Sequence, residues 1–294
     1  MKHVAPLRYG VIFKKAFCDP ETFTAFVYDV LGIQLEIDKV ETEKSFDPPI
    51  GKVDCRFDLF AEDIKNRTSV DIQHEKYVDH YHRFLHYHCA AILQQAEKSE
   101  NYQAKLQVFT VVVLTDGDKH QVDMALTDFD PRTRTGKALG EIPHKIVYLN
   151  PKYVTEATPE PLRQWLRAIE DTLDEVVNET EYTNPHIQRV FAAIEQDHIS
   201  PSERARMFDE YNEEELKRTL FEEGVSKGKL EGKLEGKLEG KLEGKLEIAR
   251  ALLAEGMPLA VIARVSGLSE AEIALDPQSH NGFGYASVRP GQRA

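Results

Sequence analysis

The strongest constraint on how this chain can fold is a four-residue repeat in its C-terminal third. Over residues 228–247 the sequence Gly-Lys-Leu-Glu occurs five times in succession. Four residues turn an α-helix by about 400°, so each leucine lies about 40° from the previous one around the helix axis. The leucines of the repeat therefore sweep about 160°. This slanted stripe differs from the straight seam that a heptad coiled coil requires.

The repeat is a poor helix former by itself. Its five glycines cost a helix about 5 kcal/mol relative to alanine. In addition, residues four apart carry the same charge, Lys on Lys and Glu on Glu, so the usual i to i+4 pairing is missing. We therefore expect the isolated segment to fray. Two interpretations stay open for residues 227–247: a spacer or self-association helix that makes a homo-oligomer, and a tolerated low-complexity extension.

Composition allows a folded core and limits how the chain can bind nucleic acid. Apolar residues make up 41% of the chain and charged residues 30%, which excludes a wholly disordered protein. The formal net charge is −13 at pH 7. A protein this acidic does not attract nucleic acid through its overall charge, so any contact with phosphate has to come from a local basic patch.

Cysteine usage and hydropathy indicate a cytoplasmic protein. The cysteines, Cys18, Cys55 and Cys89, are scattered and none belongs to a CxxC pair, which argues against a disulfide framework and a zinc ribbon. Residues 1–17 lack the apolar segment of a signal peptide, and the longest apolar run, 108–114, is too short to cross a bilayer. We therefore expect no membrane partner.

The first half of the chain alternates helical and strand-like segments. Apolar residues recur at helical spacing over 11–32, where Gly32 ends the pattern, and again over 76–99. The expected strands are 53–59, 69–73, 107–114 and 144–149, with 62–68 as a hairpin loop between the first two. The order of helix, strand hairpin, helix and strand predicts an α/β domain over residues 1–150.

After residue 150 the sequence predicts helices only. Thr158-Pro159, Asn184-Pro185 and Ser200-Pro201 each place a capping residue before a proline, as at the start of a helix. We therefore expect a helical extension over 151–226, followed by the repeat helix over 227–247.

Residues 248–276 have the cadence of a helix-turn-helix, with Gly256 and Gly267 between short helices. The last of these helices, 269–275, contains two glutamates and no Lys or Arg, whereas a helix that reads DNA needs hydrogen-bond donors and phosphate partners. We therefore expect a small helical packing module here. The remaining residues, 277–294, are rich in Gly, Ser, Pro and Gln and predict a disordered tail.

Acidic side chains gather on the strands of the expected hairpin. Successive side chains of a strand point to opposite faces. The apolar residues at 53, 55, 57 and 59 would share one face, with Asp58 on the other, and in the second strand Asp71 and Gln73 lie opposite the apolar face. If both apolar faces pack on one core, Asp58, Asp71 and Gln73 converge. These oxygens suit Mg²⁺, which can promote phosphodiester hydrolysis, but the same pattern also fits a solvated acidic face.

Several motifs in this region occur in the order of a known family. Residues 12–17 read Ile-Phe-Lys-Lys-Ala-Phe, and after them come Gly51-Lys52, Arg56-Phe57-Asp58 and Asp71-Ile72-Gln73. The next expected helix adds a spaced pattern of Arg83, Tyr87, Gln94-Gln95 and Tyr102. Together these motifs resemble the PD-(D/E)XK nuclease family transposases, also called recombination-promoting nucleases, over about residues 8–150.

The resemblance implies a restriction-endonuclease-like core, a mixed sheet flanked by helices, that acts as a Mg²⁺-dependent DNA endonuclease in recombination, with Mn²⁺ as the alternative ion. Asp58 would be the first metal carboxylate, Asp71 the second, and Gln73 would take the position of the signature lysine. Glutamine cannot supply a positive charge. The candidates for that charge are Lys14, Lys15 and Lys76, and these lysines together with Arg83 are the candidates for contacts with double-stranded DNA.

Two residues depart from the family's pattern. Gly10 stands where many relatives have Asp before the Phe-Lys-Lys motif, and Asp71 has a shorter side chain than the usual Glu. A second function therefore stays open: a catalytically degenerate nuclease-like protein that acts as a binding or assembly module through its helical tail.

Histidines are concentrated next to these motifs, at His74, His80, His82, His86 and His88. His82 and His86 are four residues apart, so on a helix they share a face and could chelate zinc. The alternative is a surface or interface cluster, whose partial protonation at about pH 6.5 would attract phosphate.

Overall fold

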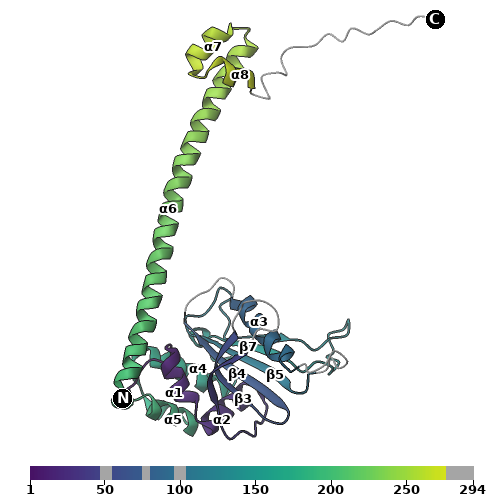
Figure 1. Ribbon diagram of the computed structural model, residues 1–294, viewed down its shortest axis with the longest axis vertical. Helices are drawn as coiled ribbons and strands as arrows, with labels where there is room; N and C mark the ends of the chain where they lie inside the picture. The colour runs from purple at the N-terminus through teal and green to yellow at the C-terminus, as the bar shows by residue number, and fades with distance from the viewer. Residues whose placement is uncertain (47–54, 75–79, 96–103, 276–294) are drawn as a thin grey trace, which may run out of the picture. The chain divides into compact units, whose positions relative to one another are not determined.

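The computed structural model describes residues 1–46, 55–74, 80–95 and 104–275 of the chain (Figure 1). The chain divides into two compact units, one formed by Met1–Glu214 and the other beginning at Glu215. No helix among the described residues is long and apolar enough to span a membrane.

The expected helix over 11–32 consists of two helices, α1 (Gly10–Phe17) and α2 (Pro20–Leu31). The break is local, because Asp19 accepts a backbone N–H from the first turn of α2 at 2.9 Å and Pro20 follows it directly. An aspartate cap followed by proline starts a new helix and so ends the previous one. Gly32 ends α2 as predicted, in the left-handed conformation with a φ of 70°.

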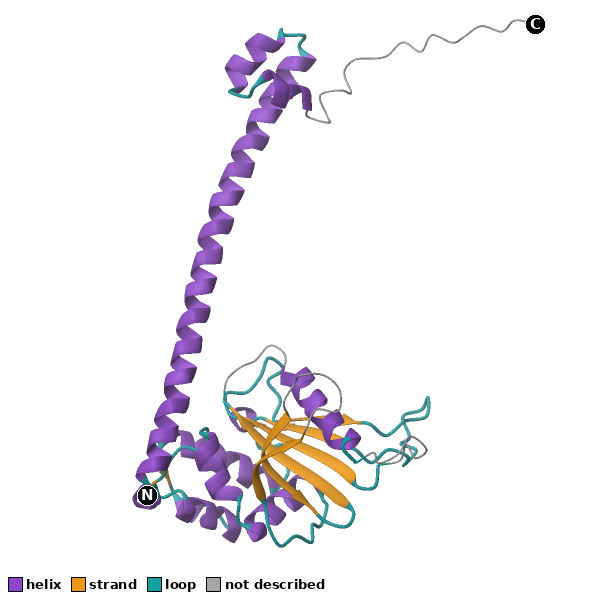
Figure 2. Cartoon of the chain, viewed as in Figure 1, coloured by secondary structure: helices purple, strands orange, loops and turns teal. Residues whose placement is uncertain are grey.

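Figure 2 shows the strands gathered in one sheet. Six strands of the described residues form this mixed sheet in the order β2-β3-β4-β5-β7-β6. The neighbours β4, β5 and β7 are parallel, and the other neighbours are antiparallel. The strands are β2 (Glu41–Phe46), β3 (Cys55–Glu62), β4 (Asn66–Gln73), β5 (Gln107–Leu114), β6 (Met124–Asp128) and β7 (Lys145–Leu149). A mixed sheet with flanking helices confirms the predicted α/β class, although β2 and β6 were not expected from the sequence.

Helices cover both faces of the sheet. On one face α3 (His80–Leu93) packs on a buried cluster that includes Phe57 and Tyr148. On the other face α1, α2, α4 (Leu162–Asp171) and α5 (Pro185–Ala193) share a cluster with Val70 and Val111 of the sheet. Helices that follow residue 150 therefore belong to the same core as the N-terminal helices.

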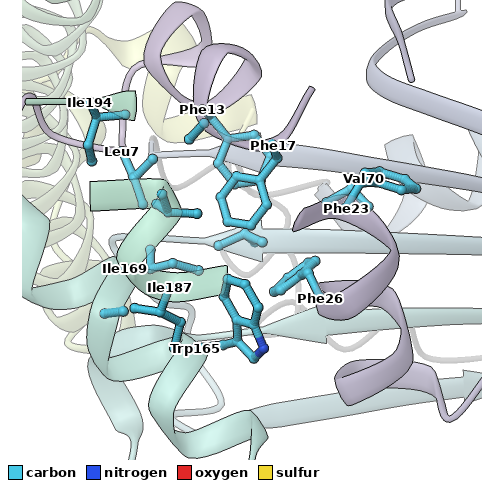
Figure 3. Close-up of a cluster of buried hydrophobic side chains, with 14 of the residues drawn as sticks. Leu7, Phe13, Phe17, Phe23, Phe26, Val70, Trp165, Ile169, Ile187 and Ile194 are labelled. Atoms are coloured by element: carbon cyan, nitrogen blue, oxygen red, sulfur yellow. The ribbon is translucent and has the colours of Figure 1, made fainter. Parts of the chain in front are cut away.

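Trp165 of α4 connects three helices of this second cluster (Figure 3). Its ring centroid lies 5.2 Å from that of Phe26 in α2 and 5.8 Å from that of Phe17 in α1. Its indole N–H donates a hydrogen bond to Asp29 Oδ2 at 2.7 Å. One buried side chain thus fixes how α1, α2 and α4 pack together.

Two of the three helix starts that the sequence predicts after residue 150 are present. Asn184 caps α5, and Ser200 and Glu203 accept each other's backbone N–H at the start of α6 (Pro201–Ala254). Thr158-Pro159 does not start a helix, because the Thr158 hydroxyl binds Asp123 and a neighbouring backbone N–H, and α4 begins only at Leu162.

Short elements complete the first unit. β1 (Lys2–His3) pairs antiparallel with β8 (Val176–Val177), a strand in a region where the sequence predicts only helix. Single 3₁₀ turns occur at Pro151–Tyr153, Thr172–Asp174, Glu179–Glu181 and Gln196–His198.

The second unit is helical. α6 runs through the whole repeat and is followed by α7 (Leu259–Ser266) and α8 (Glu270–Leu275). Gly256 and Gly267 have φ values of 73° and 66°, and each ends the preceding helix as the helix-turn-helix cadence predicts. The small core consists of Ala249, Ile262, Leu268 and Ile273. Fraying of the isolated repeat stays a prediction, and the expected tail over 277–294 lies outside the described residues.

Candidate active site

Asp58 of β3 and Asp71 of β4 each bind the backbone of the other strand. The last registered pair on this side of the hairpin is Leu59 with Val70, which places Asp58 opposite Asp71. The backbone N–H of Asp58 donates to Asp71 Oδ1 at 3.0 Å, and the N–H of Ile72 donates to Asp58 Oδ2 at 3.1 Å. Carboxylates therefore link the strands where the regular pairing stops. We call Asp58 and Asp71 the acid pair.

The strand reaches this geometry by breaking the alternation that the sequence predicts. Cys55 and Phe57 pack in the cluster under α3, whereas Leu59 packs in the cluster under α1. The prediction that the apolar residues over 53–59 share one face is therefore wrong, and residue 53 lies outside the described residues. The phase changes at Asp58, next to Glu43 of β2, which has a φ of 54°. The hydrogen bonds from backbone N–H groups to the carboxylates of Asp58 and Asp71 stabilise this change of phase. A hydropathy pattern does not predict such bonds.

Burial raises the pKa of both members of the acid pair. Asp71 is 4% exposed, and within the described ranges its Oδ2 has no hydrogen-bond partner. Burial is the main cause of the raised pKa of Asp58 and of Asp71, and the charge of Asp58 raises the pKa of Asp71 further. A buried carboxyl group with an unsatisfied oxygen, beside a second, half-buried carboxyl group, is stabilised by a shared proton or by a cation. The donor set fits a hard divalent ion such as Mg²⁺.

The structure places one of the predicted lysines beside the acid pair. Lys14 Nζ lies 3.7 Å from Asp58 Oδ1. It also donates a hydrogen bond to Glu43 Oε1 at 2.9 Å, and this bond lowers the pKa of Glu43. Lys15 instead donates to Glu203 Oε1 at 2.9 Å, on α6. Lys76 lies outside the described residues. Of the three lysines, Lys14 is the one that is shown to contact the acid pair.

Arg83 and Gln73 also lie near the acid pair. Arg83 is exposed on α3 with its guanidinium 5.4 Å from the ring centroid of Tyr87, and its charge lowers the pKa of both aspartates. Gln73 is buried on β4 two residues after Asp71, so both residues belong to the same face of the strand. Cationic groups from both helical layers therefore act on the acid pair.

A residue that sequence reasoning missed caps the start of α1, although it lies about 200 residues later in the chain. Glu210 of α6 accepts the backbone N–H of Gly10 at 2.8 Å and that of Val11 at 3.3 Å. A Cβ at Gly10 would lie 3.7 Å from Glu210 Oε1, so the carboxylate occupies the space in front of this glycine. Burial is the main cause of the raised pKa of Glu210, and the charge of Asp58 adds to it. The available signal is that Tyr9, the residue before α1, supplies no capping side chain. The sequence does not show that Glu210 accepts the free N–H groups.

Replacing Glu210 by Ala is expected to destabilise the first unit by about 1–2 kcal/mol, because the N–H groups of Gly10 and Val11 lose their cap. The free energy of unfolding, measured in urea, checks this. Asp209→Ala, an exposed neighbour on the same helix, is the matched control and is expected to change stability little. Equal stability of the two variants would contradict a capping role for Glu210.

Other residues of the motifs have structural roles. Gln94 accepts a hydrogen bond from Arg67 at 2.8 Å, and Gln95 accepts the backbone N–H of Leu106 at 2.8 Å. Tyr87 packs on Phe57 with 5.7 Å between ring centroids. These contacts join α3 and the turn after it to β3, to β4 and to the segment before β5, and Tyr102 lies outside the described residues.

The histidines have different surroundings, and chelation of zinc by His82 and His86 stays a prediction. His88 is fully buried, stacks on Phe129 at 5.0 Å, and has its pKa lowered to about 3 by burial, so it is neutral. His82 and His86 are exposed on α3. Across the described parts of the chain, no group of three or more His, Cys, Asp or Glu side chains is placed to hold a metal. The acid pair thus offers two carboxylates to an ion.

Comparison with protein families agrees with this arrangement. No curated protein and no solved structure gives a significant match to the chain. A family model described as the Rpn/YhgA-like nuclease family C-terminal HTH domain matches residues 242–275, which include α7 and α8. A second model, described as PD-(D/E)XK nuclease family transposase, matches residues 12–218, which include the whole sheet and the acid pair. The chain therefore belongs to the PD-(D/E)XK nuclease family transposases, as its motifs predict.

Proposed function

We propose that this protein is a Mg²⁺-dependent endonuclease that hydrolyses phosphodiester bonds in double-stranded DNA. The acid pair carries the proposal, because the half-buried Asp58 lies opposite the buried Asp71 and Asp71 Oδ2 is unsatisfied within the described residues. A bound divalent ion would favour the charged forms of both groups, which burial alone disfavours.

Asp58 and Asp71 would hold the ion. When bound, Mg²⁺ polarises a phosphoryl oxygen and lowers the pKa of a bound water. In the reaction, water adds to phosphorus and one P–O ester bond breaks, which leaves a phosphate monoester and a free hydroxyl. Lys14, whose Nζ lies 3.7 Å from Asp58 Oδ1, would supply the positive charge that Gln73 cannot. Its ammonium would attract the DNA phosphate to the acid pair.

Contact with DNA would also involve the C-terminal helices. The family description of residues 242–275 names a helix-turn-helix domain, whereas the sequence alone favoured a packing module. α8 itself, Glu-Ala-Glu-Ile-Ala-Leu, carries no cation. Binding would therefore rest on cations of the neighbouring helices, such as Arg264 of α7, and the net charge of −13 limits it to such local contacts.

A plasmid-nicking assay tests the endonuclease. The wild-type protein is expected to convert supercoiled plasmid to the nicked form with Mg²⁺ or Mn²⁺ and to stop doing so with excess chelator. Asp58→Ala is expected to be inactive, and the exposed Asp38→Ala, as a matched control, is expected to nick like the wild type. Equal nicking by wild type and Asp58→Ala would assign the activity to a contaminant and refute the proposal.

One observation favours the alternative, a degenerate nuclease core that binds or assembles without cutting. Gly10 supplies no carboxylate, and the described residues place no third His, Cys, Asp or Glu with the acid pair to hold a metal. Calorimetric titration with Mg²⁺ separates the two functions, because the endonuclease has to bind the ion and Asp58→Ala has to abolish that binding. A wild-type protein without measurable Mg²⁺ binding would leave only the alternative.

A further inference from the structure

The repeat presents a continuous row of exposed leucines. Leu230, Leu234, Leu238 and Leu242 of α6 are 61%, 54%, 68% and 47% exposed. We call these four residues the leucine row. On the same stretch of helix, a Cβ added at any of the repeat glycines from Gly228 to Gly244 would meet nothing within 4 Å. Exposed apolar rows of this kind usually mark an interaction surface.

Each residue type of the repeat forms its own row, because the period of four lies close to one helical turn. Successive residues are rotated by about 100°, so the rows follow one another around the helix as Gly, Lys, Leu and Glu. The leucine row therefore lies between a row of lysines and a row of glutamates, and the glycine row lies on the opposite side of the helix. Two charged rows of opposite sign thus flank the apolar one.

The charges of these rows have no partner on their own helix. Residues at i+4 are identical, and the residue at i+3 is Gly for each Lys and Leu for each Glu. Pairing at i+3 or i+4 is the way in which charges stabilise a single helix. Consistently, no ion pair joins a Lys to a Glu within residues 229–243, all of which the structure describes. Opposite charges that would offset the repulsion between neighbouring lysines, and between neighbouring glutamates, therefore have to come from another helix.

A second copy of the repeat complements these rows in one orientation only. If two helices meet through their leucine rows in parallel, related by a two-fold axis along the helices, each lysine row lies beside the partner's glutamate row. If they meet antiparallel, lysines lie beside lysines and glutamates beside glutamates, which is destabilising. A row of residues at i, i+4 and i+8 is also the ridge that interdigitates in helix packing with a crossing angle of about −50°.

We propose that the chain forms a parallel homodimer through the leucine row, with the helices crossing between Leu234 and Leu238 and with the lysine row of each copy paired with the glutamate row of the other. The partner is a second copy of this chain. The proposal does not depend on nuclease activity, since its readout is mass and cross-linking. It also explains how a helix with five glycines is stabilised, because burial of the leucines offsets the loss of about 5 kcal/mol in helix propensity.

Light scattering of the full chain tests the dimer. The wild type is expected to have twice the chain mass of 33.5 kDa. The variant with Leu234→Asp and Leu238→Asp is expected to have the single-chain mass, while its first unit stays folded because its core is separate. Gly236→Ala, on the opposite side of the helix, is the matched control and is expected to remain dimeric. A wild type of single-chain mass, or a dimeric double variant, would refute the proposal.

Disulfide cross-linking tests the orientation. The exposed Cys18 and Cys89 are first replaced by Ser, and Leu234→Cys and Leu238→Cys are then made in separate chains with different tags. A parallel dimer is expected to give disulfides within each variant, because residue 234 lies beside residue 234 of the partner. An antiparallel dimer would give only mixed disulfides between the two variants, since bridging requires Cα atoms within about 7 Å. That outcome would overturn the parallel arrangement.

Discussion

Replacing Asp71 by Asn is expected to reduce Mg²⁺-dependent nicking at least about 100-fold, which corresponds to about 2.7 kcal/mol of barrier. Asparagine keeps the shape of the side chain, and its carbonyl oxygen can still accept the backbone N–H of Asp58, which is 3.0 Å away in the wild type. The variant loses only the negative charge that an ion requires. Rates of plasmid nicking for wild type and variant at equal concentration measure the effect.

The same substitution is expected to stabilise the protein in the absence of metal at pH 7. Burial raises the pKa of Asp71 well above its ordinary value, so the folded state holds its proton more tightly than the unfolded state. Stability is therefore greatest below the unfolded pKa of about 3.9 and is lost as the pH rises toward the folded pKa. The asparagine side chain of the variant does not titrate, so the variant avoids this loss of stability.

Urea unfolding with chelator, from pH 4 to pH 8, measures this difference. The gap between Asp71→Asn and wild type is expected to widen as the pH rises, while the exposed control Asp209→Asn follows the wild type at every pH. A variant that is less stable than the wild type at pH 7 would show that the charge of Asp71 stabilises the fold. A variant that nicks at the wild-type rate would remove Asp71 from the site.

Replacing Trp165 by Ala is expected to destabilise the first unit by about 3–5 kcal/mol. The indole of α4 is fully buried and packs on Phe17 of α1 and Phe26 of α2, so the smaller alanine leaves a cavity (Figure 3). Its hydrogen bond to Asp29 Oδ2, at 2.7 Å, would also be lost. The urea midpoint, followed by far-UV circular dichroism, measures the effect, because Trp165 is the single tryptophan of the chain and fluorescence would disappear with it.

Trp165→Phe separates packing from hydrogen bonding. Phenylalanine retains most of the apolar contact with Phe17 and Phe26, so we expect a loss of about 1–2 kcal/mol, mainly from the missing bond to Asp29. If Trp165→Ala costs no more than Trp165→Phe, the contacts of the indole with α1 and α2 do not determine the stability of this unit.

Periodic segments of the fold could be predicted from the sequence, and segments held by distant contacts could not. β5 is a run of apolar β-branched residues between turn signals, and its predicted bounds, 107–114, agree with the structure. β2, with the sequence Glu-Thr-Glu-Lys-Ser-Phe, is too polar to read as a strand and forms because it pairs with β3. Local pattern thus identifies strands that bury their own side chains, and misses those that depend on a partner.

The candidate site divides in the same way. Asp58, Asp71 and Gln73 stood out because two adjacent strands carry them at alternating positions. The change of phase at Asp58 could not be foreseen, since it rests on carboxylates that bind the backbone of the opposite strand. Glu210 could not be foreseen either, because 200 residues separate it from its partner Gly10.

Because Glu210 caps α1, a fragment of this chain that is to fold by itself has to include residue 210. A truncated chain that stops before residue 201 would retain every strand of the sheet but would lack the carboxylates that hold α1 and Lys15. Dissection of this protein for biophysical work should therefore cut after Glu214, where the first compact unit ends. Limited proteolysis of the full chain is expected to release a resistant product of about that length, since exposed helix lies beyond it.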